Sequence, residues 1–327
     1  MPRILVTPPI FKGASTACRD VFDAAGFEVV YPESDPTKMT RPQLVAQLQG
    51  IDAVVAGIEV YDETIFAGTK LHAIARGGVG YDAIDVPAAT RHGVPICITP
   101  GTNEHSVAEH AIALILACFR DIAARDREVR QGRWRRNPLR RLAGNTLGLV
   151  GLGRIGRAIV PRAQGLGLTV IAHDPLADAR FAADNNITLC SFDELLERSD
   201  IVSLHIPCTA DTTDLMNARS LSRMKPRSVL INTARGGLVD EEALLVALTK
   251  GPLFAAGLDV FKVEPPPADH PLLKLDNVVI APHTGGLDRD AVDAMGQLAA
   301  ECIVRLSRGD WPAGCVVNDE LRAAYRW

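Results

Sequence analysis

Several features that define membrane, secreted or nucleic-acid-binding proteins are missing from this chain of 327 residues. Lys and Arg total 35 against 39 Asp and Glu, so the formal net charge of −4 provides no basic field to attract nucleic acid or an anionic membrane. The longest apolar run, residues 111–119, is well short of the roughly 20 residues that a membrane-spanning helix needs. The N-terminus lacks the apolar core of a signal peptide. We therefore expect a cytoplasmic protein without nucleic-acid or membrane partners.

Cysteine occurs in no arrangement that indicates disulfides or a metal site. The chain contains no Cys-x-x-Cys pair and no paired histidine spacing, and its seven cysteines are widely separated: Cys18, Cys97, Cys118, Cys190, Cys208, Cys302 and Cys315. This odd, scattered set is typical of a reducing compartment, with most thiols buried as small apolar groups. No metal is expected.

Short apolar runs alternate with helical patterns through the first hundred residues. With 47% hydrophobic and 23% charged residues the composition is globular, and the length suggests about two domains. Strands are expected at 4–7, 27–31, 53–56, 71–75 and 94–98, and helices at 16–25, 41–49 and 86–92. Continuous apolar strands separated by helices predict a parallel sheet covered on both faces.

A second alternating series begins after residue 146. One long helix is expected at 106–130, strands at 147–150, 169–172, 201–204, 229–232, 254–257 and 278–280, and an amphipathic helix at 290–306. The apolar face of this last helix could return to pack on the first domain. We therefore predict an α/β protein with two doubly wound, Rossmann-like parallel-sheet domains. One domain, at 101–286, is inserted into a discontinuous domain formed by 1–100 and 287–327.

An arginine-rich segment lies between the long helix and the second series. Residues 131–141 read QGRWRRNPLRR, and they are expected to form an exposed arm rather than part of a core. Two interpretations stay open for this arm, a solvated connector or part of a subunit interface.

The stretch at 146–156, TLGLVGLGRIG, has the spacing of a dinucleotide-binding turn. It directly follows an apolar strand and opens a helix, which is the context that makes a Gly-x-Gly-x-x-Gly motif informative. Gly151 would permit the tight turn, Gly153 would let backbone amides approach a pyrophosphate, and Gly156 would allow close helix packing. Asp174, about 20 residues further on, would bind the ribose hydroxyls and repel a 2′-phosphate, which favours NAD over NADP. The alternative is a plain glycine turn with a surface aspartate.

Arg235 follows the apolar strand expected at 229–232, at a sheet edge where open α/β sheets bind ligands. The planar guanidinium can bind a carboxylate through two charge-assisted hydrogen bonds. Small residues on either side, Ala234, Gly236 and Gly237, leave room for a ligand. The competing interpretation is an arginine that caps or salt-bridges at the surface.

Two further strand ends carry groups suited to acid/base chemistry. His283 follows the strand at 278–280, and histidine exchanges protons near neutral pH. Glu264, which precedes a run of prolines, is the candidate carboxylate to stabilise an imidazolium and to fix its tautomer. Taken singly, such a histidine is more often structural and such a glutamate solvated.

Several ordered blocks make the chain resemble the D-2-hydroxyacid dehydrogenase family, and within it the phosphoglycerate-dehydrogenase-like branch. Besides the blocks above they are RGGVGYDAID at 76–85, TPGTN at 99–103 with SVAE at 106–109, LHIP at 204–207 with Thr209 and Thr212, and MKP at 224–226. The resemblance covers almost the whole chain. It implies that the inserted domain binds NAD and that the discontinuous domain binds substrate.

The resemblance also implies a role for each matching residue. Arg235 would bind the substrate carboxylate, His283 would be the acid/base, and Glu264 would pair with it. Asp259 would bind the nicotinamide amide, while His205 would be structural or near the cofactor rather than a second base. The implied cofactor-binding residues are Gly151, Gly153, Arg154, Ile155, Gly156, Asp174, Pro207, Thr212, Thr233, Ala234, Asp259 and Gly286. The implied substrate-binding residues are Gly78, Val79, Gly80 and Arg235.

The expected function is an NAD-dependent oxidoreductase that interconverts a D-2-hydroxy acid and its 2-keto acid, with 3-phosphoglycerate as the first choice of substrate. Phosphoglycerate enzymes of the family usually have a basic residue in the loop after the third strand, whereas this chain has Glu59 in the sequence AGIE. The alternative is therefore a glyoxylate/hydroxypyruvate reductase, and a further one is an NAD-sensing, co-repressor-like binding protein. Family members are commonly homodimers, which would give Trp134 in the arm an interface role.

Overall fold

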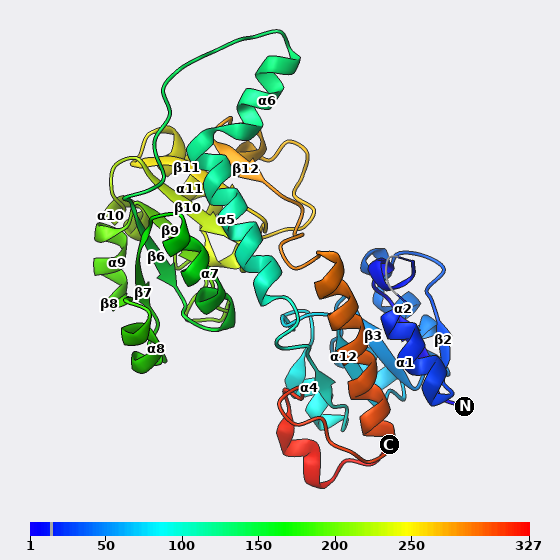
Figure 1. The fold of residues 1–327 in the computed structure, drawn as a ribbon. Helices are drawn as coiled ribbons and strands as arrows, with labels where there is room; N and C mark the ends of the chain where they lie inside the picture. The colour runs from blue at the N-terminus through cyan, green and yellow to red at the C-terminus, as the bar shows by residue number, and fades with distance from the viewer. Residues whose placement is uncertain (14–15) are drawn as a thin grey trace. The chain divides into compact units, whose positions relative to one another are not determined.

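The computed structural model describes residues 1–13 and 16–327, which form two compact units (Figure 1). Unit 1 consists of Met1–Asn103 and Leu287–Trp327, and unit 2 of Glu104–Gly286. Each unit is built on one parallel sheet covered by helices on both faces. The predicted fold class is confirmed.

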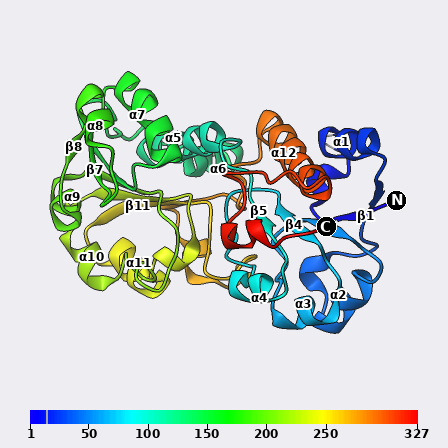
Figure 2. The ribbon, with the colours of Figure 1, turned by 90° about the horizontal axis from the view of Figure 1, so that it is seen from below.

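Unit 1 contains a sheet of five strands in the order β2-β1-β3-β4-β5. The strands are β1 (Arg3–Val6), β2 (Glu28–Val30), β3 (Ala53–Ala56), β4 (Ala73–Arg76) and β5 (Ile96–Cys97). The helices are α1 (Ala17–Ala25), α2 (Arg41–Gln47), α3 (Glu63–Gly68), α4 (Val86–Arg91) and α12 (Arg289–Ser307). Side chains alternate across the sheet, so Ile4 and Val6 pack with α1 and α12, whereas Leu5 packs with α2, α3 and α4 (Figure 2).

Unit 2 contains a sheet of seven strands in the order β12-β11-β10-β9-β6-β7-β8. The strands are β6 (Thr146–Val150), β7 (Thr169–His173), β8 (Thr188–Leu189), β9 (Ile201–Leu204), β10 (Ser228–Asn232), β11 (Leu253–Leu258) and β12 (Val278–Ile280). The helices are α5 (Glu104–Arg120), α6 (Ile122–Arg130), α7 (Arg154–Gly165), α8 (Ala179–Asp184), α9 (Phe192–Arg198), α10 (Ala218–Arg223) and α11 (Glu241–Thr249). One apolar core lies between the sheet and α5, α7 and α8, and the other lies beneath α9, α10 and α11.

Three local predictions were wrong or incomplete. The single helix expected at 106–130 is two helices, because Asp121 between α5 and α6 has φ 52°, a left-handed conformation that interrupts the helix. Helix α3 was missed, although Asp62 caps it by accepting hydrogen bonds from the amides of Thr64 and Ile65. Strand β8 was also missed, because its two residues are exposed and leave no apolar pattern.

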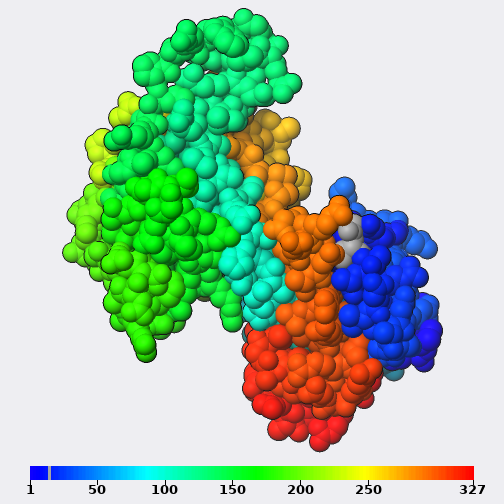
Figure 3. Space-filling model, in the orientation of Figure 1, coloured from blue at the N-terminus to red at the C-terminus, as the bar shows by residue number. Residues whose placement is uncertain are grey.

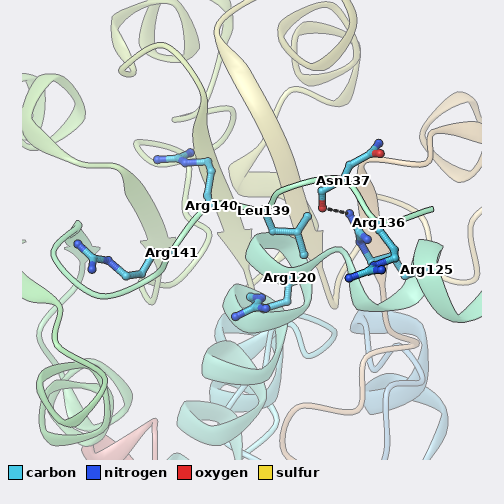
Figure 4. A pocket seen from close by; sticks show the side chains of 7 residues that line it. All are labelled: Arg120, Arg125, Arg136, Asn137, Leu139, Arg140 and Arg141. Carbon is cyan, nitrogen blue, oxygen red and sulfur yellow. Dashed lines mark hydrogen bonds between the residues drawn. The ribbon is translucent and has the colours of Figure 1, made fainter. Parts of the chain in front are cut away.

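The arginine-rich arm is exposed, as predicted, and residues 131–138 are all accessible. Together with α6 it forms a part of unit 2 that stands out from the body of that unit (Figure 3). The C-terminal part of the arm borders a hollow of about 380 Å³ (Figure 4). The residues that line this hollow are Arg120, Arg125, Arg136, Asn137, Leu139, Arg140 and Arg141. In the part of the chain that the structure describes, no helix is long and apolar enough to cross a membrane.

Candidate active site

The glycine-rich loop connects β6 to α7 in unit 2. Gly151 has φ 101°, and a Cβ there would lie 2.5 Å from the carbonyl oxygen of His205. A Cβ on Gly156 would collide with the carbonyl oxygen of Gly151. By contrast, a Cβ on Gly153 would meet no atom within 4 Å. Close packing therefore requires glycine at 151 and 156, whereas the open space at Gly153 would let a ligand approach the backbone.

Helix α7 begins at Arg154 immediately after this loop, with Gly153 at its N-cap. Glycine has no side chain with which to satisfy the first amide groups of the helix, so these N–H groups can bind an anion. Arg154 is exposed and Ile155 is half-buried beside them. The loop and the helix end thus have the shape and the donors that a dinucleotide pyrophosphate needs.

Asp174 lies beside the glycine-rich loop, directly after β7. Its carboxylate accepts hydrogen bonds from the amides of Leu152 and Leu176, both at 2.8 Å. The side chain is half-buried and is held in place by backbone groups of the loop. The acidic residue that the sequence singled out is therefore positioned against the turn that would hold the pyrophosphate.

The segment after β9 contains His205, Pro207 and Thr212. His205 Nε2 lies 2.7 Å from Ser203 Oγ, and burial lowers the pKa of His205 to about 3. Because burial disfavours its charged form, this imidazole binds a proton too weakly to be an effective second base near neutral pH. Thr212 Oγ1 donates to the Pro207 carbonyl oxygen at 2.8 Å and closes the turn between them.

Two buried polar atoms near these strand ends have no hydrogen-bond partner among the described residues, His205 Nδ1 and Thr233 Oγ1. Unpaired buried donors and acceptors are rare in proteins, and a bound polar ligand is one way in which they are satisfied. Both atoms follow strands of the sheet that carries the glycine-rich loop. They add polar contacts to a site whose backbone already fits a dinucleotide.

Arg235 is presented by a turn at the end of β10. The side chain of the buried Asn232 forms this turn: its Nδ2 donates to the Arg235 carbonyl oxygen at 2.8 Å, and its Oδ1 accepts from the Ala234 amide at 3.0 Å. A Cβ on Gly236 would collide with the backbone of Phe261, so the chain must be glycine there. The sequence analysis did not assign this positioning role to Asn232.

Asp259, at the end of β11, holds the loop that contains His283. Its carboxylate accepts from the amides of Thr284 at 2.8 Å and Gly285 at 2.9 Å, and its carbonyl oxygen accepts from the His283 amide at 2.8 Å. Burial alone would raise the pKa of Asp259, but His110, 3.2 Å away, and the two amide donors outweigh it and lower that pKa. Asp259 is thus an ionised group that fixes the loop, and its contact with nicotinamide stays a prediction.

Glu264 and His283 form a close pair, although 19 residues separate them in the chain. Glu264 Oε2 lies 2.6 Å from His283 Nδ1, and Glu264 Oε1 accepts from the Phe261 amide at 2.9 Å. Burial would raise the pKa of Glu264, but the hydrogen bonds from His283 and the Phe261 amide, with the charges of His283 and Arg235, lower it. The structure therefore brings together the three residues that the sequence predicted to be catalytic. Among the residues that the structure describes, none forms a hydrogen bond with the other ring nitrogen, Nε2.

The predicted substrate-binding loop lies in unit 1, after β4. Gly78 has φ 148°, and its carbonyl oxygen accepts from the Thr99 amide at 3.0 Å. Gly78 is buried, while Val79 and Gly80 are half-buried. The remaining predicted residue, Gly286, is half-buried at the last position of unit 2.

A parallel α/β sheet with a glycine-rich turn, an anion-binding helix end and a histidine–carboxylate pair defines a dinucleotide-binding protein equipped for acid/base chemistry. Residues 112–285 match the family model of the D-isomer specific 2-hydroxyacid dehydrogenase, NAD binding domain. The chain belongs to this family and carries its NAD-binding domain.

Curated relatives carry two different enzyme names. The chain is 40% identical over 311 residues to a D-3-phosphoglycerate dehydrogenase of Archaeoglobus fulgidus, covering 94% of this chain but 58% of the relative. It is 37% identical over 328 residues to a glyoxylate reductase of Korarchaeum cryptofilum, covering 98% of this chain and 97% of the relative. The chain therefore spans little more than half the length of the phosphoglycerate relative.

A solved structure gives the same fold. The D-lactate dehydrogenase of Aquifex aeolicus, complexed with NAD and lactic acid, superposes with a TM-score of 0.84 at 25% identity. The match covers 96% of this chain and 98% of the other.

Proposed function

We propose that the protein is an NAD-dependent D-2-hydroxyacid dehydrogenase, located in the cytoplasm, that interconverts a small 2-hydroxy acid and its 2-keto acid. The observation that carries this proposal is the hydrogen-bonded pair of Glu264 and His283, close enough to Arg235 for its charge to act on the carboxylate. A carboxylate-binding cation next to an acid/base pair is what this reaction needs. The seven free thiols are typical of a reducing compartment.

In the oxidative direction, Arg235 binds the substrate carboxylate, and His283 Nε2 takes the proton of the C2 hydroxyl. Bound NAD supplies the acceptor for the hydride that leaves C2. Glu264 stabilises the resulting imidazolium through Nδ1 and holds the ring in one orientation. In the reverse direction the imidazolium returns its proton to the oxygen of the reduced carbonyl.

The NAD itself would be held by the loop after β6 and by residues that follow other strands of unit 2. The amides of Arg154 and Ile155 would bind the pyrophosphate, and Asp174 would accept hydrogen bonds from the ribose hydroxyls. The other proposed contacts come from Gly151, Gly153, Gly156, Pro207, Thr212, Thr233, Ala234, Asp259 and Gly286.

The test is NADH consumption by the purified protein with phosphohydroxypyruvate, hydroxypyruvate, glyoxylate and pyruvate. Turnover on at least one of them is expected, because both 3-phosphoglycerate oxidation and glyoxylate or hydroxypyruvate reduction use the same three side chains. Absence of turnover on every 2-keto acid, combined with tight NADH binding, would contradict the proposal. That result would favour an NAD-sensing binding protein instead.

Asp174→Asn is expected to weaken preference for NADH over NADPH. Asparagine keeps an acceptor for the Leu152 amide but removes the charge that would repel a 2′-phosphate. Because a hydrogen bond to a charged group contributes about 1.5–3 kcal/mol, we expect the KM for NADH to rise by roughly 10- to 100-fold. The measurement is kcat/KM with both cofactors, with the exposed Asp184→Asn on α8 as control. An unchanged ratio between the cofactors would remove Asp174 from the ribose site.

We propose further that the protein is a homodimer and that α6 and the arm form its interface. Three large apolar side chains are exposed there, Ile122, Val129 and Trp134, and Trp134 is 78% accessible. Exposed apolar groups gathered on one surface typically mark a contact with another protein, and tryptophan often dominates such contacts.

Trp134→Glu is accordingly expected to shift the protein from dimer to monomer. Loss of an interface tryptophan typically costs about 2–4 kcal/mol, so the dimer dissociation constant should rise by roughly 30- to 1,000-fold. Light scattering after size-exclusion chromatography measures this shift over a dilution series. Val246→Glu on α11, at a side chain that is also exposed, is the matched control. Equal masses for both variants would place the interface elsewhere.

A further inference from the structure

The sheet of unit 1 has a topological switch point between β1 and β3. Its order, β2-β1-β3-β4-β5, means that the chain leaves β1 toward one edge and then continues from β3 toward the other. In open parallel sheets ligands bind at the carboxyl ends of the strands at such a point. Thr7 directly follows β1, and Glu59 lies in the loop after β3. These two residues therefore occupy the ligand-binding end of unit 1.

Glu59 is a buried carboxylate bound to the ends of both strands. Only 4% of its surface is accessible, and its Oε1 accepts hydrogen bonds from the Gly57 amide at 3.0 Å and the Tyr61 hydroxyl at 2.9 Å. The hydroxyl of Thr7 is the third donor to the same oxygen, and it also lies 3.2 Å from the Val55 carbonyl oxygen. A buried charge is stable only when it is satisfied in this way.

The local backbone is shaped around the second oxygen of Glu59. A Cβ on Gly57 would lie 2.7 Å from Glu59 Oε2, so the glycine leaves the space that the carboxylate uses. This oxygen accepts no hydrogen bond from the residues that the structure describes, 1–13 and 16–327. It is an acceptor for a donor on a ligand.

The donors that could bind an anionic ligand at this point already form hydrogen bonds with the carboxylate of Glu59. Burial and the neighbouring Glu59 charge raise the pKa of Tyr61 far above its ordinary value, while Arg76 acts in the opposite direction. Tyr61 therefore stays a protonated phenol that donates to Glu59, and the Thr7 hydroxyl and the Gly57 amide do the same. The loop at 57–61, GIEVY, contains no basic residue.

The guanidinium of Arg76 lies close enough to Tyr61 for its charge to act on that phenol. Arg76, the last residue of β4, donates from Nη1 to the Gly77 carbonyl oxygen at 2.7 Å, beneath the proposed substrate loop. A phosphate at the switch point would meet a fixed negative charge, whereas a hydroxyl would meet an acceptor.

We propose that Glu59 is a specificity-determining residue, which makes unit 1 select 2-keto acids with an uncharged distal group and reject phosphorylated ones. This inference rests on the dehydrogenase activity proposed above, and it reverses the sequence-based first choice of 3-phosphoglycerate. The favoured class comprises small acids whose distal group is a hydrogen or a hydroxyl.

The experiment compares kcat/KM for hydroxypyruvate, glyoxylate and phosphohydroxypyruvate in the wild type and Glu59→Gln. The wild type is expected to prefer hydroxypyruvate over its phosphorylated counterpart by at least about tenfold. Glutamine keeps an acceptor for the three donors but removes the charge, so the preference should fall by about tenfold, mainly through a lower KM for the phosphorylated acid. Glyoxylate, which has no distal group, should change least. Glu33→Gln, an exposed position in the same unit, is the control.

The outcomes separate this inference from the activity on which it rests. A wild type that uses phosphohydroxypyruvate as well as hydroxypyruvate would overturn the role of Glu59 and leave the dehydrogenase proposal intact. This result needs no variant, so it decides the question even when Glu59→Gln fails to fold. An unchanged preference in a folded Glu59→Gln would also overturn the role. No turnover of any 2-keto acid by the wild type would overturn both proposals.

Discussion

His283→Asn is expected to lower kcat for 2-keto acid reduction by about 10²- to 10⁴-fold, the typical contribution of a positioned acid/base. Asparagine is chosen because His283 has φ 56°, and asparagine tolerates this left-handed conformation better than most residues do. The hydrogen bonds that the amides of residues 283–285 donate to Asp259 should persist in the variant. The loss should therefore reflect the missing proton donor rather than a collapsed loop.

Steady-state kinetics measure kcat, and a fluorescence titration measures the affinity for NADH; together they test this prediction. NADH affinity should stay unchanged, and the exposed His92→Asn is the control for loss of a histidine elsewhere. Near-normal turnover in His283→Asn would show that another group moves the proton.

Glu264→Gln gives a complementary result on the same pair. Removal of the carboxylate at 2.6 Å takes away the partner that stabilises the protonated ring, so the pH profile of reduction should be displaced toward lower pH. A fall in rate without any displacement of the pH profile would mean that Glu264 only supports the loop.

Arg235→Gln is expected to lower kcat/KM by about 10²- to 10⁴-fold, because two charge-assisted hydrogen bonds of about 1.5–3 kcal/mol each disappear. The larger part should appear in the KM for the 2-keto acid. Arg235→Lys should retain some activity but lose roughly 10- to 100-fold, because a point charge replaces a planar fork.

NADH binding separates this effect from a disturbed cofactor site, and it should be unaffected by either substitution. Arg219→Gln, at an exposed position on α10, removes a comparable charge from the same unit and should leave kcat/KM unchanged. An unaltered KM and kcat in Arg235→Gln would mean that the substrate carboxylate binds elsewhere.

The course of most strands was predictable from the sequence, because a strand buried on both faces is almost entirely apolar. Strand β3 contains only Ala and Val, and β6 and β9 each contain one polar residue, Thr146 and Ser203. Where burial weakens, this signal disappears. The exposed β8 was invisible, and the break at Asp121 depends on one residue's backbone conformation rather than on any periodicity.

Residue types at the site were also predictable, but their supporting contacts were not. His283, Glu264 and Arg235 were recognisable at strand ends, where parallel sheets gather functional groups. The positioning roles of Asn232 and Asp259 depend on hydrogen bonds to particular backbone atoms, and those bonds exist only in the folded loops.

By itself the sequence determined the two parallel sheets, the glycine-rich turn and the side-chain types of the histidine–glutamate pair, because apolar runs, glycine spacing and side-chain type are local properties. Only the tertiary structure decided what Glu59 does. In the sequence, Glu59 was notable only because it lies in a loop where a basic residue was expected. In the fold it is a buried carboxylate that joins the ends of β1 and β3. Thr7 and Glu59 are far apart in the chain and meet because the sheet places their strands side by side, and packing of this kind leaves no local pattern.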